Sequence, residues 1–347
     1  MSKIYRLTER YEFPEGYSTE EKLHSLVRYA ILSPSPRNTQ PWRFRVDAEG
    51  VDILADEERT LPVADQDGRE LAISIGAVAH RLGLAMRCHR MAAKIEYVTD
   101  TSDPQLMARV QCVGSHDPNY DDLVMMSQIE ERRDIAKEDD SERIESQYLH
   151  DLTTAAASRD CELVWIGHGP LRRKLAELIE IADKRLFSEK AFRAELSDWM
   201  RSPNSSERDG VPGRVVGLSG PQASFAPWLV KRVNLGKAAG REDLERVEAA
   251  PALGVLITKS DQMGDWMDAG QALSAVLLKA CYDGLACELY DQPLELPGLR
   301  HEIRLDMPNK CYPQAILRVT TAPPGHPLPR RPIESFLEPP ADTAPKA

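Results

Sequence analysis

The stretch SPSPRNTQPWRFRV, residues 33–46, begins too polar and too rich in proline for a core strand, yet it carries a tryptophan that favours burial. Pro34, Pro36 and Pro41 each fix their own φ and push the preceding residue toward extended geometry. The backbone is therefore held stiff, and a stiff loop presents its hydrogen-bonding groups in fixed directions. The sequence predicts a rigid polar loop that leads into a strand at Trp42.

The polar side chains of this loop are uncharged. Ser35, Asn38 and Gln40 supply donors and acceptors that suit a phosphate ester or the edge of an amide-like ring more than a metal ion. The alternative is a turn that caps the preceding helix, with Trp42 packed into the core. Composition alone leaves both interpretations open.

The composition restricts the classes of function. The chain has 347 residues, of which 42% are hydrophobic and 29% charged, with a net charge of −11. Such a chain is long enough for two domains or one large α/β unit, and its acidity argues against a general nucleic-acid or anionic-membrane surface. A local basic pocket is still compatible with this charge. No export signal is evident at the N-terminus and no apolar run approaches the length of a membrane span, so we expect a cytoplasmic protein.

Metal and hydrolase motifs are absent from the sequence. The six cysteines lie far apart without a CxxC pair or zinc-like spacing, which predicts reduced thiols and no metal site. The eight histidines form neither HExxH nor a catalytic triad spacing. No GxGxxG follows a strand and no Walker loop occurs, so a nicotinamide nucleotide is not expected to be held as in a Rossmann fold.

Hydrophobic periodicity predicts helices and strands in the first part of the chain. We expect a helix over 22–32 capped by Ser18 or Thr19, a hairpin over 42–57, and a helix that starts from 65–68. That second helix has an apolar stripe and a face of small residues that permits close approach of a neighbour. Strands at 94–99 and 107–113 complete this part.

The later part of the chain repeats this pattern. It begins with a helix at 144–157, a strand at 161–166 and a helix at 170–187. A strand at 252–258 is followed by a helix capped by Asp265 and stopped by Gly284, with a final strand at 314–319. Two comparable halves, each with a small-faced helix beside strands, indicate an internal pseudo-dimer.

Between these elements lies an irregular segment rich in Gly, Pro and Ser. A loop of this length is usually functional or disordered, and we favour a lid or a partner-covering arm. Its apolar residues available for docking are Val211, Val215, Val216, Leu218, Phe225 and Trp228. Core packing is also the expectation for Tyr312, although either Tyr312 or Trp228 can line a substrate face.

A charged stretch, IEERRDIAKEDDSERIE at 129–145, separates the halves as a solvated helix or linker. We therefore expect one half at 1–125 and a second at 126–338, with a lid-like insertion at about 200–235. The tail at 339–347 is expected to be disordered.

Four motifs occur in a recognisable order: SPSPRNTQPWRFRV, the paired arginines of IEERRDIAK, the helix that ends in DGL before DQPLE, and the closing PRRP. In these motifs the chain resembles the FMN-dependent nitroreductase family, and specifically its single-chain, doubled Acg-type subgroup. The resemblance covers residues from about 20 to 337 and is most specific in the first motif. It implies an α+β fold in which the nitroreductase fold is duplicated within one chain.

The resemblance also implies a cofactor site shared by the two halves. The implied FMN-binding residues are Ser35, Pro36, Asn38, Gln40, Arg132, Arg133, Lys137, Pro293, Leu294, Glu295, Arg330 and Arg331. The loop would meet the phosphate, ribityl chain and ring edge, the basic residues would meet the phosphate, and the backbone amides around Leu294 and Glu295 would face flavin N5. The alternatives are an exposed charged helix start, an ordinary turn before a strand, and a solvated tail anchor. RRDIAK also departs from the family pattern, since it lacks the serine and the last arginine.

The function implied by this resemblance is transfer of hydride from NAD(P)H through flavin N5 to an electron-poor acceptor, such as a nitroaromatic or a quinone. No catalytic side chain stands out, because the flavin carries the chemistry. One alternative is a non-catalytic protein that stores or sequesters FMN under its lid. Another is a scaffold that has lost flavin, which the altered RRDIAK motif suggests. A monomer supplies both half-sites, and a homodimer is also compatible.

Overall fold

The computed structural model describes residues 13–98, 103–131, 143–157, 160–213, 218, 220–321 and 328–338. The first half is built from α2 (Thr19–Ala30), η1 (Pro36–Asn38), β1 (Trp42–Val46), β2 (Gly50–Ala55), η2 (Glu57–Arg59), α3 (Arg69–Cys88), β3 (Met91–Tyr97), β4 (Leu106–Ser115) and α4 (Tyr120–Glu131). These elements confirm the predicted helices, hairpin and strands of the first half.

The second half has the same kinds of element and a long helical insertion. In chain order it contains α5 (Ser146–Ala157), β5 (Glu162–Trp165), α6 (Pro170–Ser188), α7 (Lys190–Trp199), β6 (Met200–Arg201), β7 (Val211–Pro212), α8 (Pro221–Ser224), α9 (Ala226–Arg232), α10 (Gly236–Ala249), β8 (Ala252–Thr258), α11 (Met263–Tyr282), β9 (Ala286–Leu289), η4 (Gln292–Leu294), α12 (Pro297–Asp306), η5 (Pro308–Lys310), β10 (Tyr312–Thr320) and η6 (Ile333–Phe336). The strand predicted at 252–258 is found at those positions.

The two main sheets have the same topology. One has the strand order β1-β2-β4-β3 and the other β5-β8-β10-β9, and all neighbours in both are antiparallel. In each sheet a 20-residue helix connects the second strand to the third, and a 12-residue helix precedes the first. The chain is therefore α+β, and the repeated topology fits the duplication that the sequence predicts.

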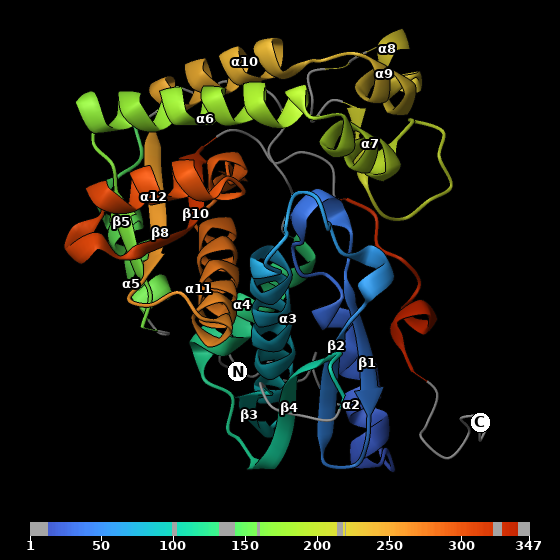
Figure 1. Cartoon of the computed structure of the whole chain (residues 1–347). Coiled ribbons are helices and arrows are strands. Elements are labelled where there is room, and N and C mark those ends of the chain that lie inside the picture. The colour runs from blue at the N-terminus through green and yellow to red at the C-terminus, as the bar shows by residue number, and fades with distance from the viewer. Residues whose placement is uncertain are drawn as a thin grey trace.

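Helices α3 and α11 lie side by side at the centre of the molecule (Figure 1) and join the two halves. Gly76 and Gly270 are each the eighth residue of their helix. A Cβ on Gly76 would lie 2.0 Å from the Met267 carbonyl oxygen, and one on Gly270 would lie 2.0 Å from that of Ile73. The small-residue faces thus allow backbone-to-backbone contact in a nearly two-fold arrangement.

The predicted N-terminal caps of α2 and α11 can be compared with the structure, and only the first was correct. Ser18 accepts a hydrogen bond from the Glu21 amide, and Glu21 accepts one from the Ser18 amide, so Ser18 caps α2 as predicted. The prediction for α11 was wrong by a few residues. Gln262 is its N-cap and Asp265 lies inside the first turn, where its carboxylate accepts from the Gln262 amide. Gly284, with φ of 73°, ends α11 as predicted.

The insertion lies between the first two strands of the second sheet, in residues 166–251, whereas a short turn at 47–49 joins the equivalent strands of the first sheet. Its helices α6 and α10 pack side by side across the top of the molecule in Figure 1, above both sheets. Val211 and Leu218 are buried as the docking prediction requires. Phe225 and Trp228 are 66% and 61% exposed, so the prediction that they dock or pack in a core was wrong.

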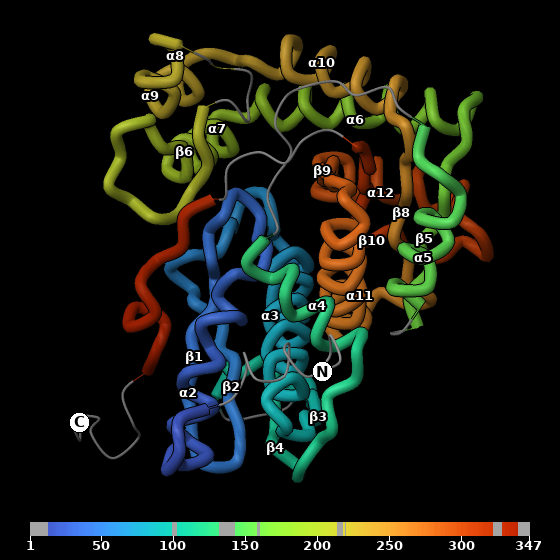
Figure 2. Tube along the Cα trace, turned by 180° about the vertical axis from the view of Figure 1, so that it is seen from behind, coloured from blue at the N-terminus to red at the C-terminus, as the bar shows by residue number. Residues whose placement is uncertain are grey.

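The end of the described chain returns to the first half. Segment 328–338 runs beside β1 (Figures 1 and 2), where the Glu338 amide donates to the Phe44 carbonyl. Phe336 is fully buried against Trp42 and Phe44. Trp42 therefore packs into the core, as one interpretation of the opening motif predicts.

Two other predictions concern the junction and the tail. The proposed boundary after residue 125 lies within the continuous helix α4, which packs against both α3 and α11. Residues 132–142, which hold most of the charged stretch, and the tail at 339–347 lie outside the described residues.

Among the described helices, α3 is long and apolar enough to span a membrane by length and composition. The sequence analysis did not identify it as such. In the structure 78% of its most apolar window is buried inside the protein, as in a core helix.

Candidate active site

The opening loop has an unusual backbone. Arg37, Asn38 and Gln40 have φ of 50°, 54° and 54°, which is the left-handed region that side chains other than glycine rarely occupy. The Ser35 hydroxyl accepts a hydrogen bond from the Gln40 amide and closes the turn. Left-handed residues cost free energy and are concentrated at functional sites, so the loop conformation must be held by its surroundings.

Asn38 is the point where three distant segments meet. Its side-chain amide donates to the carbonyl oxygens of Gly210 at 3.2 Å and Pro329 at 3.1 Å, and its Oδ1 accepts from Arg330 at 2.7 Å. Asn38 is buried, with 2% of its surface exposed. Asn38 therefore ties the loop to the insertion and to the C-terminal segment.

Gln40 makes equivalent connections. Its Nε2 donates to the Arg208 carbonyl at 2.9 Å, and its Oε1 accepts from the Arg331 amide at 3.0 Å. The Arg331 guanidinium donates to the Gln40 carbonyl at 3.0 Å. Both amide side chains are thus engaged by the protein itself, from the insertion on one side and from the tail on the other.

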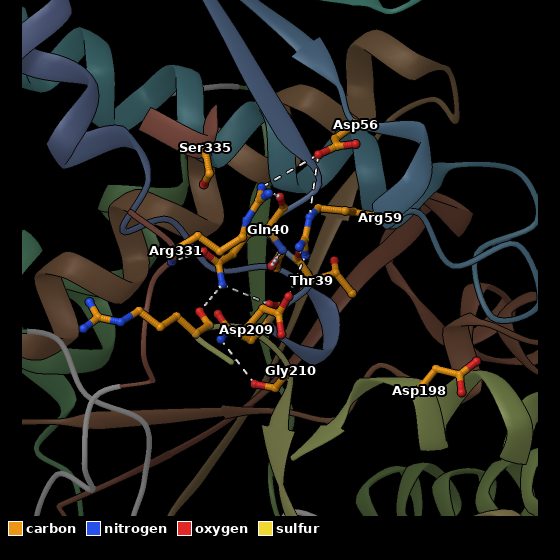
Figure 3. Close-up of polar contacts among 12 residues, drawn as sticks. Thr39, Gln40, Asp56, Arg59, Asp198, Asp209, Gly210, Arg331 and Ser335 are labelled. Atoms are coloured by element: carbon orange, nitrogen blue, oxygen red, sulfur yellow. Dashed lines mark hydrogen bonds and ion pairs between the residues drawn. The ribbon is translucent and has the colours of Figure 1, made fainter. Parts of the chain in front are cut away.

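The insertion is fastened to this loop by an ion triplet (Figure 3). The Asp209 carboxylate accepts from Arg59 Nη1 at 2.8 Å and from Arg201 Nη2 at 2.6 Å, and its side chain is 4% exposed. Burial alone would raise the pKa of Asp209, but the hydrogen bonds from the two arginines outweigh it and lower the pKa. The carboxylate is therefore ionised across neutral pH and clamps segment 201–210 onto the loop.

The two C-terminal arginines have different roles. Arg330 donates to the carbonyl oxygens of Ile31, Leu32 and Ser33, which follow the end of α2, and Arg81 also donates to the Leu32 carbonyl. Arg331 lies 4.2 Å above the Phe336 ring, and its nearest carboxylate oxygen, in Asp56, is 3.8 Å away. Its Nε is buried without a hydrogen-bond partner. Burial, followed by the charge of Arg59, lowers the pKa of Arg331 to about 10.

A cavity of about 540 Å³ lies beside the loop, between the two halves and the insertion. This volume is within the range of small-molecule sites, which is about 300–1,000 Å³. Leu186 and Phe192 line it from the insertion, Leu294 and Glu295 from the turn before α12, and Tyr312 from the start of β10. The expectation that Tyr312 packs in the core was wrong, since it lines the cavity with the Arg304 guanidinium 3.8 Å above its ring.

Arg37 connects the loop to the cavity. It donates to Glu195 at 2.6 Å and lies 3.8 Å from Glu295 Oε2, and its guanidinium is 4.8 Å above the Phe192 ring. Glu195 in turn accepts from the amides of Val63 and Ala64, which belong to the cavity wall.

The cavity contains carboxyl groups with raised pKa values, of which the sequence analysis assigned only Glu295 to the site. Burial, followed by the charge of Glu295, raises the pKa of Glu70 well above its ordinary value. Burial raises the pKa of Glu295 to about 7. Asp65 has a raised pKa for the same reason, but it accepts from the amides of Glu70 and Leu71 as a cap of α3.

The predicted site residues fall into three groups. Ser35, Asn38, Gln40, Arg330 and Arg331 lie together, and Pro36 starts the turn η1 of the same loop. Leu294 and Glu295 line the cavity and Pro293 is buried beside them. Arg132, Arg133 and Lys137 lie outside the described residues.

Arg59, Arg69, Glu70 and Asp209 were not assigned as site residues in the sequence analysis. A signal for Asp209 was present, because it belongs to the long polar segment that we interpreted as a lid. No local signal marked Glu70, since the charge of Glu295, which raises its pKa, comes from the other half. Among the described residues, no three His, Cys, Asp or Glu side chains are placed to hold a metal ion.

Comparison with known proteins extends these observations. No protein-family model matches the chain. "Putative NAD(P)H nitroreductase Rv3131" of Mycobacterium tuberculosis (strain ATCC 25618 / H37Rv) is 28% identical over 331 residues, which cover 94% of this chain and 92% of that protein. "Putative NAD(P)H nitroreductase acg" of the same strain is 26% identical over 341 residues, which cover 93% and 97%.

Solved structures with partial similarity include NfnB of Mycobacterium smegmatis, an FMN-dependent nitroreductase in complex with NADPH. It has a TM-score of 0.38 and 13% identity, and the match covers 61% of this chain and 96% of NfnB. Iodotyrosine deiodinase bound to FMN and 3-iodo-L-tyrosine has a TM-score of 0.37 and 16% identity, with 60% and 94% covered. By sequence, the chain is similar over more than nine tenths of its length to mycobacterial proteins named as NAD(P)H nitroreductases, Acg among them, and the resemblance drawn from its motifs is confirmed.

Proposed function

We propose that the protein binds FMN and transfers hydride from NAD(P)H to an electron-poor acceptor such as a nitroaromatic or a quinone. One observation carries this proposal. The polar loop with Asn38 and Gln40 contacts Arg330 and Arg331, and Arg37 of the same loop lies 3.8 Å from Glu295, which lines the cavity. These residues come from opposite ends of the chain, and all but Arg37 are ones that the nitroreductase motifs assign to the flavin.

The side chains present suit FMN. Arg331 offers an unused, buried Nε–H to a phosphate, and Arg59 adds a second guanidinium nearby, since both lie within 3.8 Å of Asp56. Leu186, Phe192 and Leu294 give the cavity apolar walls that exclude water from a ring. When bound, FMN supplies reversible acceptance and donation of hydride.

Arg331 gives the test of cofactor binding. We expect Arg331→Met to weaken FMN binding by at least about tenfold, because a charge-assisted hydrogen bond contributes about 1.5–3 kcal/mol. The measurement is quenching of flavin fluorescence when FMN is titrated into the purified protein. Arg90→Met is the matched control, since the Arg90 side chain is 57% exposed and pairs only distantly with Asp117.

Unchanged FMN affinity in Arg331→Met would contradict the proposal that this arginine binds the FMN phosphate. Failure of the wild-type protein to bind FMN would overturn the proposed function as a whole and favour a scaffold without flavin. With FMN bound, consumption of NADPH in the presence of a nitroaromatic supports the oxidoreductase.

A second candidate function is storage of FMN, and one feature favours it. The carbonyl oxygens of Arg208 and Gly210 engage the side chains of Gln40 and Asn38, so the insertion covers the loop. A flavin that is reduced by dithionite but not by NAD(P)H would support storage, because the small reductant reaches a covered ring and the nucleotide does not. Rapid anaerobic bleaching by NADPH would exclude it.

A further inference from the structure

Glu295 has a carboxylate oxygen with no hydrogen-bond partner. Its Oε2 is buried, and the nearest cationic atom, Arg37 Nη2, lies 3.8 Å away. Arg37 already donates to Glu195 at 2.6 Å. An ionised carboxylate that is buried in this way loses hydration without a full replacement, so the neutral acid is favoured.

Glu70 faces the same cavity from the other half of the molecule. It is 6% exposed and lies in the first turn of α3, and its Oε1 is 3.4 Å from Arg69 Nη2. Arg69 is committed to the Gln314 carbonyl through Nη1 at 2.7 Å. The amides of Glu70 and Leu71 at the start of the helix are occupied by Asp65.

The other cations of the cavity are also engaged. Arg300 forms a two-point pair with Asp261, at 2.6 and 3.0 Å. Arg304 donates to the Lys310 carbonyl and lies above the Tyr312 ring. Neither guanidinium therefore compensates Glu70 or Glu295 directly.

Further acids increase the negative charge around the pair. Asp65, Asp67 and Glu189 line the cavity. The charge of Asp291 raises the pKa of Glu295 further. Asp291 accepts from the Ile316 amide at 2.9 Å, so its acceptor capacity is partly used. His301 also lines the cavity, but its side chain is exposed and cannot replace a buried proton donor. Glu295 Oε2 is thus buried without a hydrogen-bond partner, and the Glu70 carboxyl has only the 3.4 Å contact from Arg69.

We propose that Glu70 and Glu295 hold one proton between them and deliver it to the acceptor in the cavity. This inference rests on the proposed function, which supplies the hydride from a reduced nicotinamide or flavin. As hydride adds to the acceptor, an O–H bond forms on a nitro or quinone oxygen and the carboxyl O–H bond breaks. The two electrons of that bond stay on the carboxylate, which solvent then reprotonates.

The test uses FMN-loaded protein as wild type, Glu70→Gln, Glu295→Gln and the double variant. Anaerobic stopped flow separates reduction by NADPH from reoxidation by a quinone. We expect the double variant to lose about 100-fold in the reoxidation rate, which is the lower range for a general acid, and to lose its dependence on pH. Reduction by NADPH should change much less, because no acceptor oxygen is protonated in that step.

A second readout does not depend on activity or on flavin. Infrared spectra of the protein without FMN should show the carbonyl stretch of a protonated carboxyl at pH 6, with loss of the band above pH 8. Glu295→Gln should remove the band or shift its titration. Glu177→Gln, at an exposed position on α6 away from the residues that line the cavity, is the matched control and should leave the spectrum and both rates unchanged.

The outcomes separate the two proposals. No protonated carboxyl band at pH 6, or a double variant with wild-type reoxidation and pH profile, overturns the proton-sharing pair even if FMN turnover is normal. A band that titrates as expected in a protein without any FMN turnover supports the shared proton but overturns both its delivery and the proposed oxidoreductase function.

Discussion

Gly76→Ala is expected to lower the free energy of unfolding by about 3 kcal/mol or more, with an equivalent loss for Gly270→Ala. The new Cβ would lie 2.0 Å from a backbone carbonyl of the facing helix, and a backbone atom cannot rotate away as a side chain can. Overpacking usually costs about 1–3 kcal/mol, and this contact is at the severe end because α3 and α11 must separate. The measurement is the urea midpoint of the purified variants.

Gly83→Ala in the same helix is the control. The nearest atom to its added Cβ is the Ile95 Cδ1 at 3.4 Å, which is ordinary contact with a side chain. Since alanine favours helix over glycine by about 1 kcal/mol, this variant should be unchanged or slightly more stable. Equal midpoints for Gly76→Ala and Gly83→Ala would contradict the close contact of the two helices.

Asp209→Ala is expected to release the insertion from the polar loop. Its loss removes the carboxylate between Arg59 and Arg201 and leaves Arg59 only the longer carboxylate contact to Asp56 at 3.7 Å, and removal of one partner from a buried ion pair costs about 3–5 kcal/mol. Both arginine side chains are about one-fifth exposed, so water compensates part of this cost and we expect the lower value. A local cost of about 3 kcal/mol increases opening roughly a hundredfold.

Limited trypsin digestion measures this opening, because Arg208 is exposed in the segment that is held down. We expect cleavage near Arg208 to become at least about tenfold faster in Asp209→Ala, together with faster release of bound FMN. Asp198→Ala is the control, since the Asp198 side chain is exposed and only its backbone carbonyl, which the substitution keeps, accepts from Arg201. Wild-type digestion of Asp209→Ala would show that the insertion is held by other contacts.

The fold could be predicted well because its signals are local or repeated. The capping residue Ser18 and the stop at Gly284 depend on neighbours within a few residues, and both predictions were confirmed. The small-faced helices around Gly76 and Gly270 predicted close packing, since no side chain is present to separate the backbones. The same strand order in both sheets fits the pattern that occurs twice in the sequence.

The site was only partly predictable, because its parts are distant in sequence. The loop at Asn38 and Gln40 has a distinct motif, but its contact with Asp209 and Arg59 depends on how the insertion folds back. Burial raises the pKa of both Glu70 and Glu295, and the charge of Glu295, from the other half, raises the pKa of Glu70 further. Glu70 does not differ in sequence from an ordinary surface glutamate, and Glu295 was marked only by its place in the DQPLE motif. Phe225 and Trp228 show the opposite error, since apolar side chains alone do not establish burial.

The unequal connections of the two sheets have a further consequence. In an assembly of two identical subunits, any added segment appears twice, and the copies must fit around the shared axis together. Here residues 166–251 join β5 to β8, while a short turn joins β1 to β2. Because both halves belong to one chain, one side can carry a long insertion while its counterpart keeps a short turn, and the cavity at their junction has different walls on its two sides.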